Sequence, residues 1–154
     1  MNRGLILVGN ATFRHSNTAL LSVSSVEAPT IVSSMDFDRK LASTLRRLGV
    51  PPKLLERVAG ITHRRWWAPG TSFDDAAIEA GAKALAESGI EASEIGLLIN
   101  TSVTRRNLEP SVAVKIHHGL RLPSSAMNFD LANACLGFVN GMTLAANMID
   151  SGQI

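Results

Sequence analysis

The one cysteine of the chain, Cys135, is the residue best suited to covalent chemistry. It stands where a strand-like run at 126–131 gives way to a helix-like run that ends near Ile149. A thiol in the first turn of a helix lies near the positive end of the helix dipole, which favours the nucleophilic thiolate. Cys135 is therefore a candidate nucleophile that accepts an acyl group. The alternative is a small buried hydrophobic residue, as most solitary cysteines are.

Glu109 is the second candidate, because it stands at another strand-to-helix turn. A buried strand is expected over 95–103, and Glu109-Pro110-Ser111 opens a helix that runs to Gly119. If the two strands are parallel neighbours, both turns open on the same edge of the sheet, where α/β proteins place their sites. A carboxylate there could remove a proton from the carbon beside a thioester carbonyl. The alternative is an ordinary partner for the helix dipole.

The elements that must position these residues alternate along the chain. Hydrophobic spacing and stop signals predict helices at 36–48, 53–58, 72–88 and 109–119, and a last one ending near Ile149. Buried strands are expected at 5–8, continuing towards Phe13, and at 95–103 and 126–131, with an extended or loop segment at 17–34. The order helix, strand, helix, strand, helix over 72–150 is typical of an α/β domain with mostly parallel strands.

The last helix carries apolar residues on every face. Because a helix that is apolar all round is buried on all sides, we expect protein both above and below it. Asn133, just before Cys135, could cap this helix, and we assign it no catalytic role.

The amino-acid composition excludes several classes of protein and of binding site. The chain has 154 residues, 45% of them hydrophobic and 18% charged, with a net charge of +2, which predicts one well-buried folding unit. The arginine pairs are short and isolated by neutral sequence, so no nucleic-acid partner is expected. One cysteine excludes an internal disulfide, and the four histidines show no metal-ligand spacing. No apolar stretch has the length of a membrane span or a signal peptide, so we expect a cytoplasmic protein.

Two arginines, Arg64 and Arg65, stand beside the only tryptophans, Trp66 and Trp67. This composition suits an anionic, partly aromatic ligand. The alternative, which we prefer, is a solvated loop with one tryptophan anchored in the core. 

The two histidines at 117 and 118 fall in the last turn of the predicted 109–119 helix, where they favour the dipole. We interpret both as structural.

Three stretches resemble the amino-terminal half of a thiolase-superfamily condensing enzyme: IGLLINTSV at 95–103, LEPS at 108–111 and FDLANACLGF at 129–138. The broad similarity is to ketoacyl synthase III. The closer similarity is to the bacterial enzymes that start long-chain olefin biosynthesis by head-to-head condensation of two fatty acyl thioesters. The cysteine motif is specific to the superfamily, and the LEPS motif with its spacing to the cysteine (135 − 109 = 26) indicates the olefin subgroup. The resemblance covers nearly the whole chain, weakly before residue 50 and strongly from 95 onward.

The resemblance implies an α/β, thiolase-like fold, of which residues 1–154 form the amino-terminal part: a mixed, mostly parallel sheet with a buried central helix that carries the nucleophile. It makes Cys135 the acyl-accepting nucleophile and Glu109 the base that takes an α-proton from the second acyl chain. In the olefin-forming enzymes this glutamate reaches into the site of the neighbouring subunit, so a homodimer is implied. The substrates are acyl-CoA thioesters, and no cofactor is implied.

One departure concerns the oxyanion site, which in the family uses a histidine and an asparagine from a second, similar half. None of His15, His63, His117 or His118 matches those positions. The chain therefore looks like a fragment, a cleavage product or a separately encoded half, and a missing carboxy-terminal half would supply both residues. Since one oxyanion donor is worth about 100-fold in rate, we predict that the isolated chain does not condense acyl-CoA.

Two alternatives stay open. One is a decarboxylative ketoacyl synthase III, in which loss of carbon dioxide from a malonyl group creates the carbanion and Glu109 is not needed. The other is a non-catalytic half that only builds a dimer, with Cys135 inert. Arg57, Arg64 and Arg65 are unranked candidates for the CoA phosphates, and the sequence does not set the acyl chain length.

Overall fold

The computed structural model describes residues 12–154, in two compact units. The large unit consists of residues 12–24 and Phe73–Ile154, and the small unit consists of Ser25–Ser72. The assignment of residues 1–154 to one part of a single condensing-enzyme domain stays a prediction.

The large unit is built on two parallel strands, β3 (Leu97–Asn100) and β4 (Met127–Asp130). The pairing runs from Leu97 opposite Met127 to Asn100 opposite Asp130. This ladder confirms the parallel pair that the sequence predicts, although each strand is shorter than its apolar run. Glycine, threonine and serine residues flank the four paired positions of β3, and the chain leaves the ladder at Thr101.

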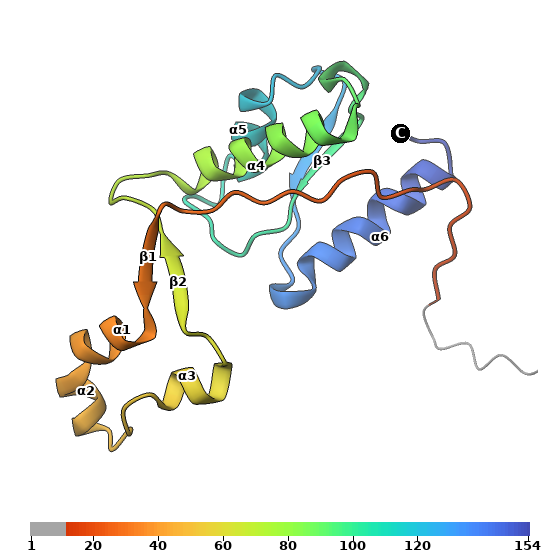
Figure 1. Ribbon diagram of the computed structural model, residues 1–154. Helices are drawn as coiled ribbons and strands as arrows, with labels where there is room; N and C mark the ends of the chain where they lie inside the picture. Colours follow the sequence, from red (N-terminus) through yellow and green to blue (C-terminus); the bar gives the residue numbers. More distant parts are fainter. Residues whose placement is uncertain (1–11) are drawn as a thin grey trace, which may run out of the picture. The chain divides into compact units, whose positions relative to one another are not determined.

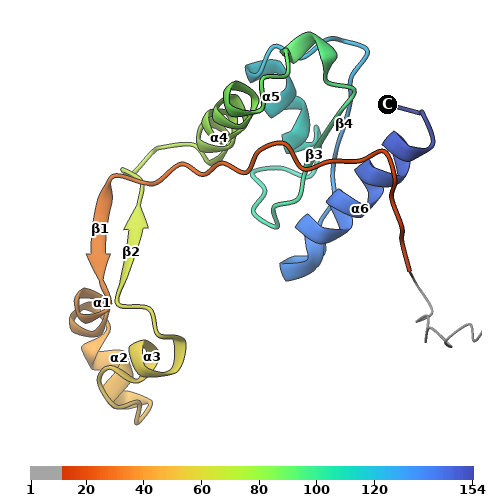
Figure 2. The same ribbon diagram turned by 45° about the vertical axis from the view of Figure 1, so that its right-hand side comes forward.

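Helices cover both sides of this ladder. In Figures 1 and 2, α4 (Phe73–Ser88) and α5 (Val112–Gly119) lie on one side of the strands and α6 (Gly137–Asp150) lies on the other. The most deeply buried residue of the described chain is Ala113 of α5, which is fully buried. Two single 3₁₀ turns, η1 (Ala92–Glu94) and η2 (Ala134–Leu136), precede β3 and α6. The predicted order of helices and strands over 72–150 is confirmed, and α5 begins at Val112 rather than at Glu109.

An extended segment of the large unit, residues 12–24, runs along α6 and α4 (Figure 1). The backbone N–H groups of Ser16 and Asn17 donate to the Asp150 carboxylate at the end of α6, at 2.9 and 2.8 Å. Further along, the Ser22 hydroxyl donates to the carbonyl of Ala84 in α4 at 2.9 Å. The strand expected at 5–8 lies outside the described residues, and its expected continuation ends in an exposed Phe13.

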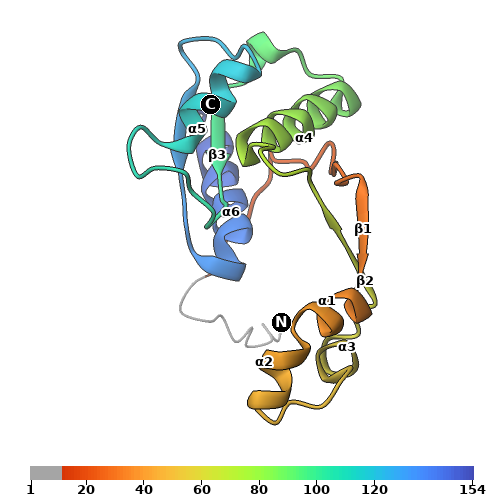
Figure 3. The ribbon, with the colours of Figure 1, turned by 90° about the vertical axis from the view of Figure 1, so that its left-hand side faces the viewer.

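The small unit pairs β1 (Thr30–Ser33) antiparallel with β2 (His63–Trp66). Its helices, α1 (Ser34–Lys40), α2 (Ala42–Arg47) and α3 (Leu54–Ala59), gather at one end of this ladder in Figure 3. The single helix expected over 36–48 is therefore wrong, because Leu41 ends α1 and precedes α2. A capping box between Ser33 and Asp36 begins α1, two residues earlier than predicted.

The solvated loop expected around the two arginines and two tryptophans is also corrected, because residues 63–66 form β2. Each of these four residues is paired with a residue of β1, and the pairing creates the strand where the polar sequence alone gives no strand signal. Among the helices of residues 12–154, none combines the length and the apolar character that a membrane span requires.

Candidate active site

The structure brings the turns that carry Cys135 and Glu109 to one edge of the β3–β4 ladder. Because the strands are parallel and end opposite each other at Asn100 and Asp130, the loop 101–111 and the turn 131–136 leave the same edge. Glu109 is exposed in the last part of its loop, next to Leu108, which is 78% exposed. No hydrogen bond joins the side chains of Cys135 and Glu109 in the part of the chain that the structure describes.

Cys135 is a free, exposed cysteine in the middle of η2. The interpretation as a buried hydrophobic residue is therefore wrong for this chain. The residue before it, Ala134, has a φ of +41°, a left-handed conformation that costs a non-glycine residue about 1–3 kcal/mol. Leu136 donates its backbone N–H to the carbonyl of Asn133 at 2.8 Å and closes the turn. The thiol thus lies in a tight, strained turn that leads into α6, two residues before that helix begins.

Asn133 does not cap the helix with its side chain, contrary to the sequence-based expectation. Its amide nitrogen donates instead to Oδ1 of Asn140 at 2.6 Å. This bond joins the turn before Cys135 to the first half of α6.

Two glycines of α6, Gly137 and Gly141, fix the helix against the end of β3. A Cβ atom on Gly137 would lie 2.9 Å from the backbone oxygen of Thr101, and one on Gly141 would lie 2.9 Å from the Thr101 methyl group. Both distances are shorter than a carbon atom tolerates. The glycines therefore allow α6, and the Cys135 turn at its start, to pack directly on the first residue of the loop that carries Glu109.

Asp130 is the residue of this site that the sequence analysis missed. Its carboxylate, with a side chain only 5% exposed, accepts from the Asn100 side chain at 2.9 Å and from the backbone N–H groups of Val112 and Ala113 at 3.0 and 2.9 Å. The guanidinium of Arg105 lies 3.9 Å away. A buried strand that ends in an acidic residue is the only signal in the sequence, because the donors come from distant parts of the chain.

The electrostatics of Asp130 follow from these contacts. Burial raises the pKa of the Asp130 carboxyl, but the hydrogen bonds from Asn100, Val112 and Ala113 and the charge of Arg105 outweigh it and lower the pKa below 3.8. The group is therefore a carboxylate at neutral pH, and it holds the start of α5 as an acidic helix cap.

The arginine and tryptophan residues of the small unit make contacts within that unit. The Arg64 guanidinium lies 4.4 Å from the centre of the Phe37 ring, and the Phe37 and Trp66 rings pack edge to face at 5.0 Å. Arg65 pairs with Glu27 at 3.0 Å. These contacts support a structural role. The expected core anchoring of one tryptophan is not seen, since Trp66 and Trp67 are 40% and 39% exposed.

None of the four histidines belongs to the Cys135 turn. His15 faces Asp150 at 3.4 Å, and His63 contacts Thr62 at 3.0 Å. His117 and His118 occupy the last turn of α5, as predicted, and a ring nitrogen of His117 lies 3.1 Å from the carbonyl of Pro123. Across residues 12–154, no three histidine, cysteine or acidic side chains come close enough together to hold a metal ion.

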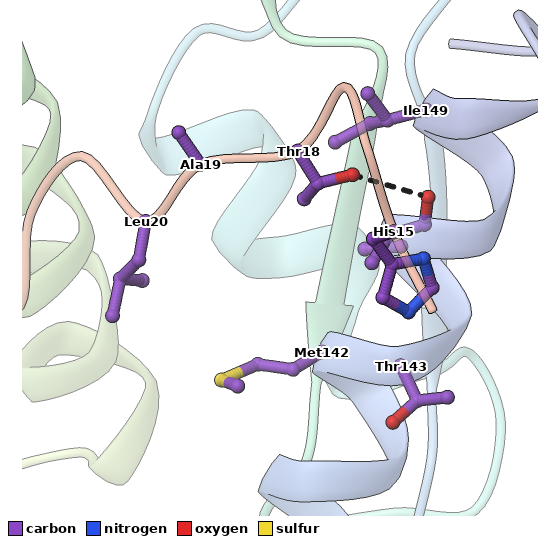
Figure 4. Close-up of a pocket in the computed structure, with 9 residues that line it drawn as sticks. His15, Thr18, Ala19, Leu20, Met142, Thr143 and Ile149 are labelled. Carbon is purple, nitrogen blue, oxygen red and sulfur yellow. Dashed lines mark hydrogen bonds between the residues drawn. The ribbon is translucent and has the colours of Figure 1, made fainter. Parts of the chain in front are cut away.

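Apolar surface surrounds the start of α6. Leu136, Phe138 and Val139 are 59%, 58% and 53% exposed. Along the second half of the helix, a hollow of about 350 Å³ separates α6 from the 12–24 segment. Figure 4 shows the residues that line this hollow, with His15, Thr18 and Leu20 coming from the extended segment and Met142, Thr143 and Ile149 from α6. The prediction that α6 is covered on all sides is not met by the described residues.

Comparisons with known proteins agree with the geometry, although no family model matches the chain. It is 42% identical over 138 residues to the acyl-CoA:acyl-CoA alkyltransferase of Xanthomonas campestris, which covers 90% of this chain and 41% of that protein. It is 34% identical over 125 residues to a β-ketoacyl-[acyl-carrier-protein] synthase III of Koribacter versatilis, covering 81% of this chain and 35% of that protein. The chain thus spans about two fifths of the length of these curated relatives.

A solved structure gives the same result. The crystal structure of cerulenin-bound OleA from X. campestris superposes with a TM-score of 0.85 at 41% identity, over 91% of this chain and 41% of that protein. Solved variants of OleA replace a glutamate, a cysteine or a histidine. The glutamate and the cysteine replaced there are 26 residues apart, as Glu109 and Cys135 are here. By sequence and by fold, the chain belongs to the thiolase-superfamily condensing enzymes related to OleA and ketoacyl synthase III, and it corresponds to their amino-terminal part.

Proposed function

We propose that this chain provides the nucleophile, Cys135, and the base, Glu109, of an enzyme that condenses two fatty acyl-CoA molecules without decarboxylation. The observation that carries the proposal is the exposed thiol in the strained turn before α6, at the edge of the sheet where the Glu109 loop also opens. The relatives named acyl-CoA:acyl-CoA alkyltransferase and the equal spacing of glutamate and cysteine in OleA support it.

The proposed reaction has two steps. The Cys135 thiolate attacks the thioester carbonyl of the first acyl-CoA, the carbon–sulfur bond to CoA breaks, and CoA leaves as a thiol after taking up a proton. The Glu109 carboxylate then takes a proton from the α-carbon of the second acyl-CoA. The resulting enolate attacks the Cys135-bound acyl carbon, a carbon–carbon bond forms, and the bond to sulfur breaks. The product is a β-keto thioester, and the Cys135 thiolate is restored.

Glu109 is proposed to act in the site of a second subunit. Its loop is exposed on both sides of the glutamate, at Leu108 and at Pro110, which suits a group that projects from its own subunit. The active form would then be a homodimer. Pairs of sites that share residues in this way lose condensation when the dimer dissociates, so activity should fall on dilution below the dimer dissociation constant.

The donors that stabilise negative charge on the thioester oxygen are proposed to come from protein outside these residues. They would lie on the segment that covers the exposed start of α6, because the exposed Leu136 and Phe138 lie within three residues of Cys135. Without those donors, each worth about 100-fold, the 154-residue chain should take up acyl groups slowly and should not condense them.

The deciding experiment uses the complete condensing enzyme, long-chain acyl-CoA and no malonyl donor. We expect a keto product from the wild type, and acylated Cys135 without product from Glu109→Gln. Glu79→Gln is the matched control, since Glu79 is an exposed glutamate on α4, and it should behave as the wild type. If product forms only when a malonyl donor is added, and Glu109→Gln then matches the wild type, the enzyme is a decarboxylative synthase III. If Cys135 takes up no acyl group, the chain is a structural half.

A further inference from the structure

The condensation step needs Glu109 in a fixed place, yet Glu109 itself lies on an exposed loop. The loop 101–111 must therefore be held by contacts of its other residues. Its middle, at Arg105, and the residue that follows it, Val112, meet the same group. Arg105 lies 3.9 Å from Oδ2 of Asp130, and the N–H of Val112, the residue after the loop, donates to that same oxygen at 3.0 Å.

The other carboxylate oxygen of Asp130 holds the elements next to the loop. Oδ1 accepts from the Asn100 side chain, at the end of β3, and from the N–H of Ala113 in α5, both at 2.9 Å. The side-chain oxygen of Asn100 in turn accepts the backbone N–H of Ser102 at 3.3 Å. The Asn100 side chain therefore connects Asp130 to the second residue of the loop. Asp130 itself ends the strand that leads to Cys135 five residues later (135 − 130 = 5).

We propose that Asp130 is a positioning residue: its carboxylate fixes the Glu109 loop to the end of the strand that leads to Cys135. This inference rests on the proposed function, in which Glu109 is the base. Asp130 does not touch substrate in this proposal, since its side chain is nearly buried beneath the loop. It acts by holding four residues that surround Glu109 along the chain.

The chemistry of the contacts requires a carboxylate rather than an amide. Each oxygen of Asp130 faces one backbone N–H and a second donor. In Asp130→Asn the amide nitrogen would point at donors whichever way the group is turned, so contacts are lost although the size of the side chain is unchanged. We expect the loop 101–111 to loosen while β4 and α6 stay in place.

Asp150 offers a matched control, because it accepts the same kind of bonds in a different place. Its two oxygens accept the N–H groups of Ser16 and Asn17, and a third bond comes from the Thr18 hydroxyl at 3.1 Å. His15 lies beside it at 3.4 Å. Asp150→Asn should therefore loosen the segment 15–18 and leave the Glu109 loop unchanged.

Trypsin can follow both segments in the 154-residue chain, since Arg106 lies in the Glu109 loop and Arg14 lies next to the 15–18 segment. Protease access follows local opening of the chain. Asp130→Asn should therefore speed cleavage after Arg106 by about tenfold or more and leave the rate of cleavage after Arg14 within about twofold of wild type. Asp150→Asn should speed cleavage after Arg14 by about tenfold or more and leave the rate of cleavage after Arg106 within about twofold of wild type. Equal effects of both variants at both sites, or an unchanged rate after Arg106 in Asp130→Asn, would overturn the proposal. If Asp130→Asn does not fold, Arg105→Gln decides: cleavage after Arg106 should rise by about threefold, and no rise overturns the proposal.

The second readout separates positioning from a purely structural role. In the complete enzyme, Asp130→Asn should keep acylation of Cys135 within about threefold of wild type and slow condensation by about tenfold or more, since a misplaced catalytic group costs up to about 100-fold per ångström. An equal loss in both steps would refute positioning. A wild type that acylates Cys135 but gives no Glu109-dependent condensation would refute the proposed function instead, and the cleavage rates would still decide what Asp130 holds.

Discussion

Gly137→Ala tests the packing that sets the position of the Cys135 turn. In an ordinary helix this change stabilises by about 0.5–1 kcal/mol, because glycine loses more backbone entropy on folding than alanine. Here the new Cβ would lie 2.9 Å from the backbone oxygen of Thr101 and 3.4 Å from that of Leu131. Backbone oxygens cannot rotate away as a side chain can. Overpacking of this kind costs about 1–3 kcal/mol, so we expect a net destabilisation of about 1–2 kcal/mol.

Gly141→Ala is the matched control for this prediction. Its Cβ would also lie 2.9 Å from a neighbour, but that neighbour is the Thr101 methyl group, and a hollow of about 220 Å³ between β3 and α6 is lined by both residues. Thr101 can shift into this space. The free-energy cost of the close contact should then be about equal to the stabilisation that alanine gives a helix relative to glycine. The free energy of unfolding should therefore stay within about 0.5 kcal/mol of wild type.

Urea unfolding followed by circular dichroism measures both variants, and the rate of Cys135 alkylation by iodoacetamide reports the turn itself. The expected order of stability is wild type and Gly141→Ala together, with Gly137→Ala below them. Gly137→Ala should also change the alkylation rate, because α6 must move away from Thr101. A Gly137→Ala protein as stable as the wild type would refute the reasoning, since the close approach of α6 to the Glu109 loop would then be absent.

Three further predictions concern single contacts. Ala134→Gly should stabilise the chain by about 0.5–1 kcal/mol, because glycine adopts the φ of +41° without strain. Ala132→Gly is the control: residue 132 is outside the positive-φ positions, so this change should not stabilise the chain. Urea unfolding midpoints that show the reverse would contradict this prediction. Lys115→Met should lower the free energy of unfolding by about 1–3 kcal/mol, because it removes the partner that lies 2.8 Å from the nearly buried Asp74 carboxylate. Lys83→Met is the control: it breaks an exposed pair with Glu87, 4.0 Å apart, and should cost less than about 0.5 kcal/mol. The hydrogen bonds from Asn17 and Ser16 lower the pKa of the Asp150 carboxyl below 3.8, so its stabilisation of the 12–24 segment is present above pH 3.8 and is lost as the pH falls through the lowered value. Amide NMR signals of Ser16 and Asn17 should follow this loss, and in Asp150→Asn they should not change with pH in this range.

The parallel pair and its edge were predictable because each strand is an apolar run that turn residues delimit. The same pattern placed Cys135 and Glu109 at corresponding turns, and the ladder confirms that the turns share an edge. A thiol and a carboxylate at such turns are compatible with acyl chemistry, but their residue types alone left the non-catalytic alternatives open, and the roles of Cys135 and Glu109 come from the family resemblance and stay proposals. The boundaries of the elements were less accurate, because hydrogen bonding at their ends depends on contacts far along the chain.

The break at Leu41 and the strand β2 could not be predicted for the same reason. The spacing of Phe37, Leu41 and Leu45 fits one helix, but the chain turns at Leu41. In β2 the residues His63, Arg64 and Arg65 carry no alternation of apolar and polar types. They form a strand because residues 30–33, far along the chain, pair with them.

Asp130 shows the limit of the sequence most clearly. The sequence shows an acidic residue at the end of a strand. It does not show that the hydrogen-bond donors of this residue lie 17, 18 and 30 residues earlier in the chain. Only the fold brings Asn100, Val112 and Ala113 around one carboxylate. A residue that positions others is therefore harder to find from sequence than one that reacts, because its role lies in its partners rather than in its own chemistry.

The surface next to Cys135 links the fold to the proposed reaction. The glycine face of α6 is filled by Thr101 of the Glu109 loop, and a second face is bounded by the 12–24 segment. The side that carries Leu136, Phe138 and Val139 stays more than half exposed, and it begins at the residue after the thiol. Exposed apolar surface of this kind is typical of a site that other protein or a ligand covers. A segment that covers it would pass next to the Cys135 turn, and in the proposed reaction that segment would therefore be the one to bring oxyanion donors to the acyl thioester.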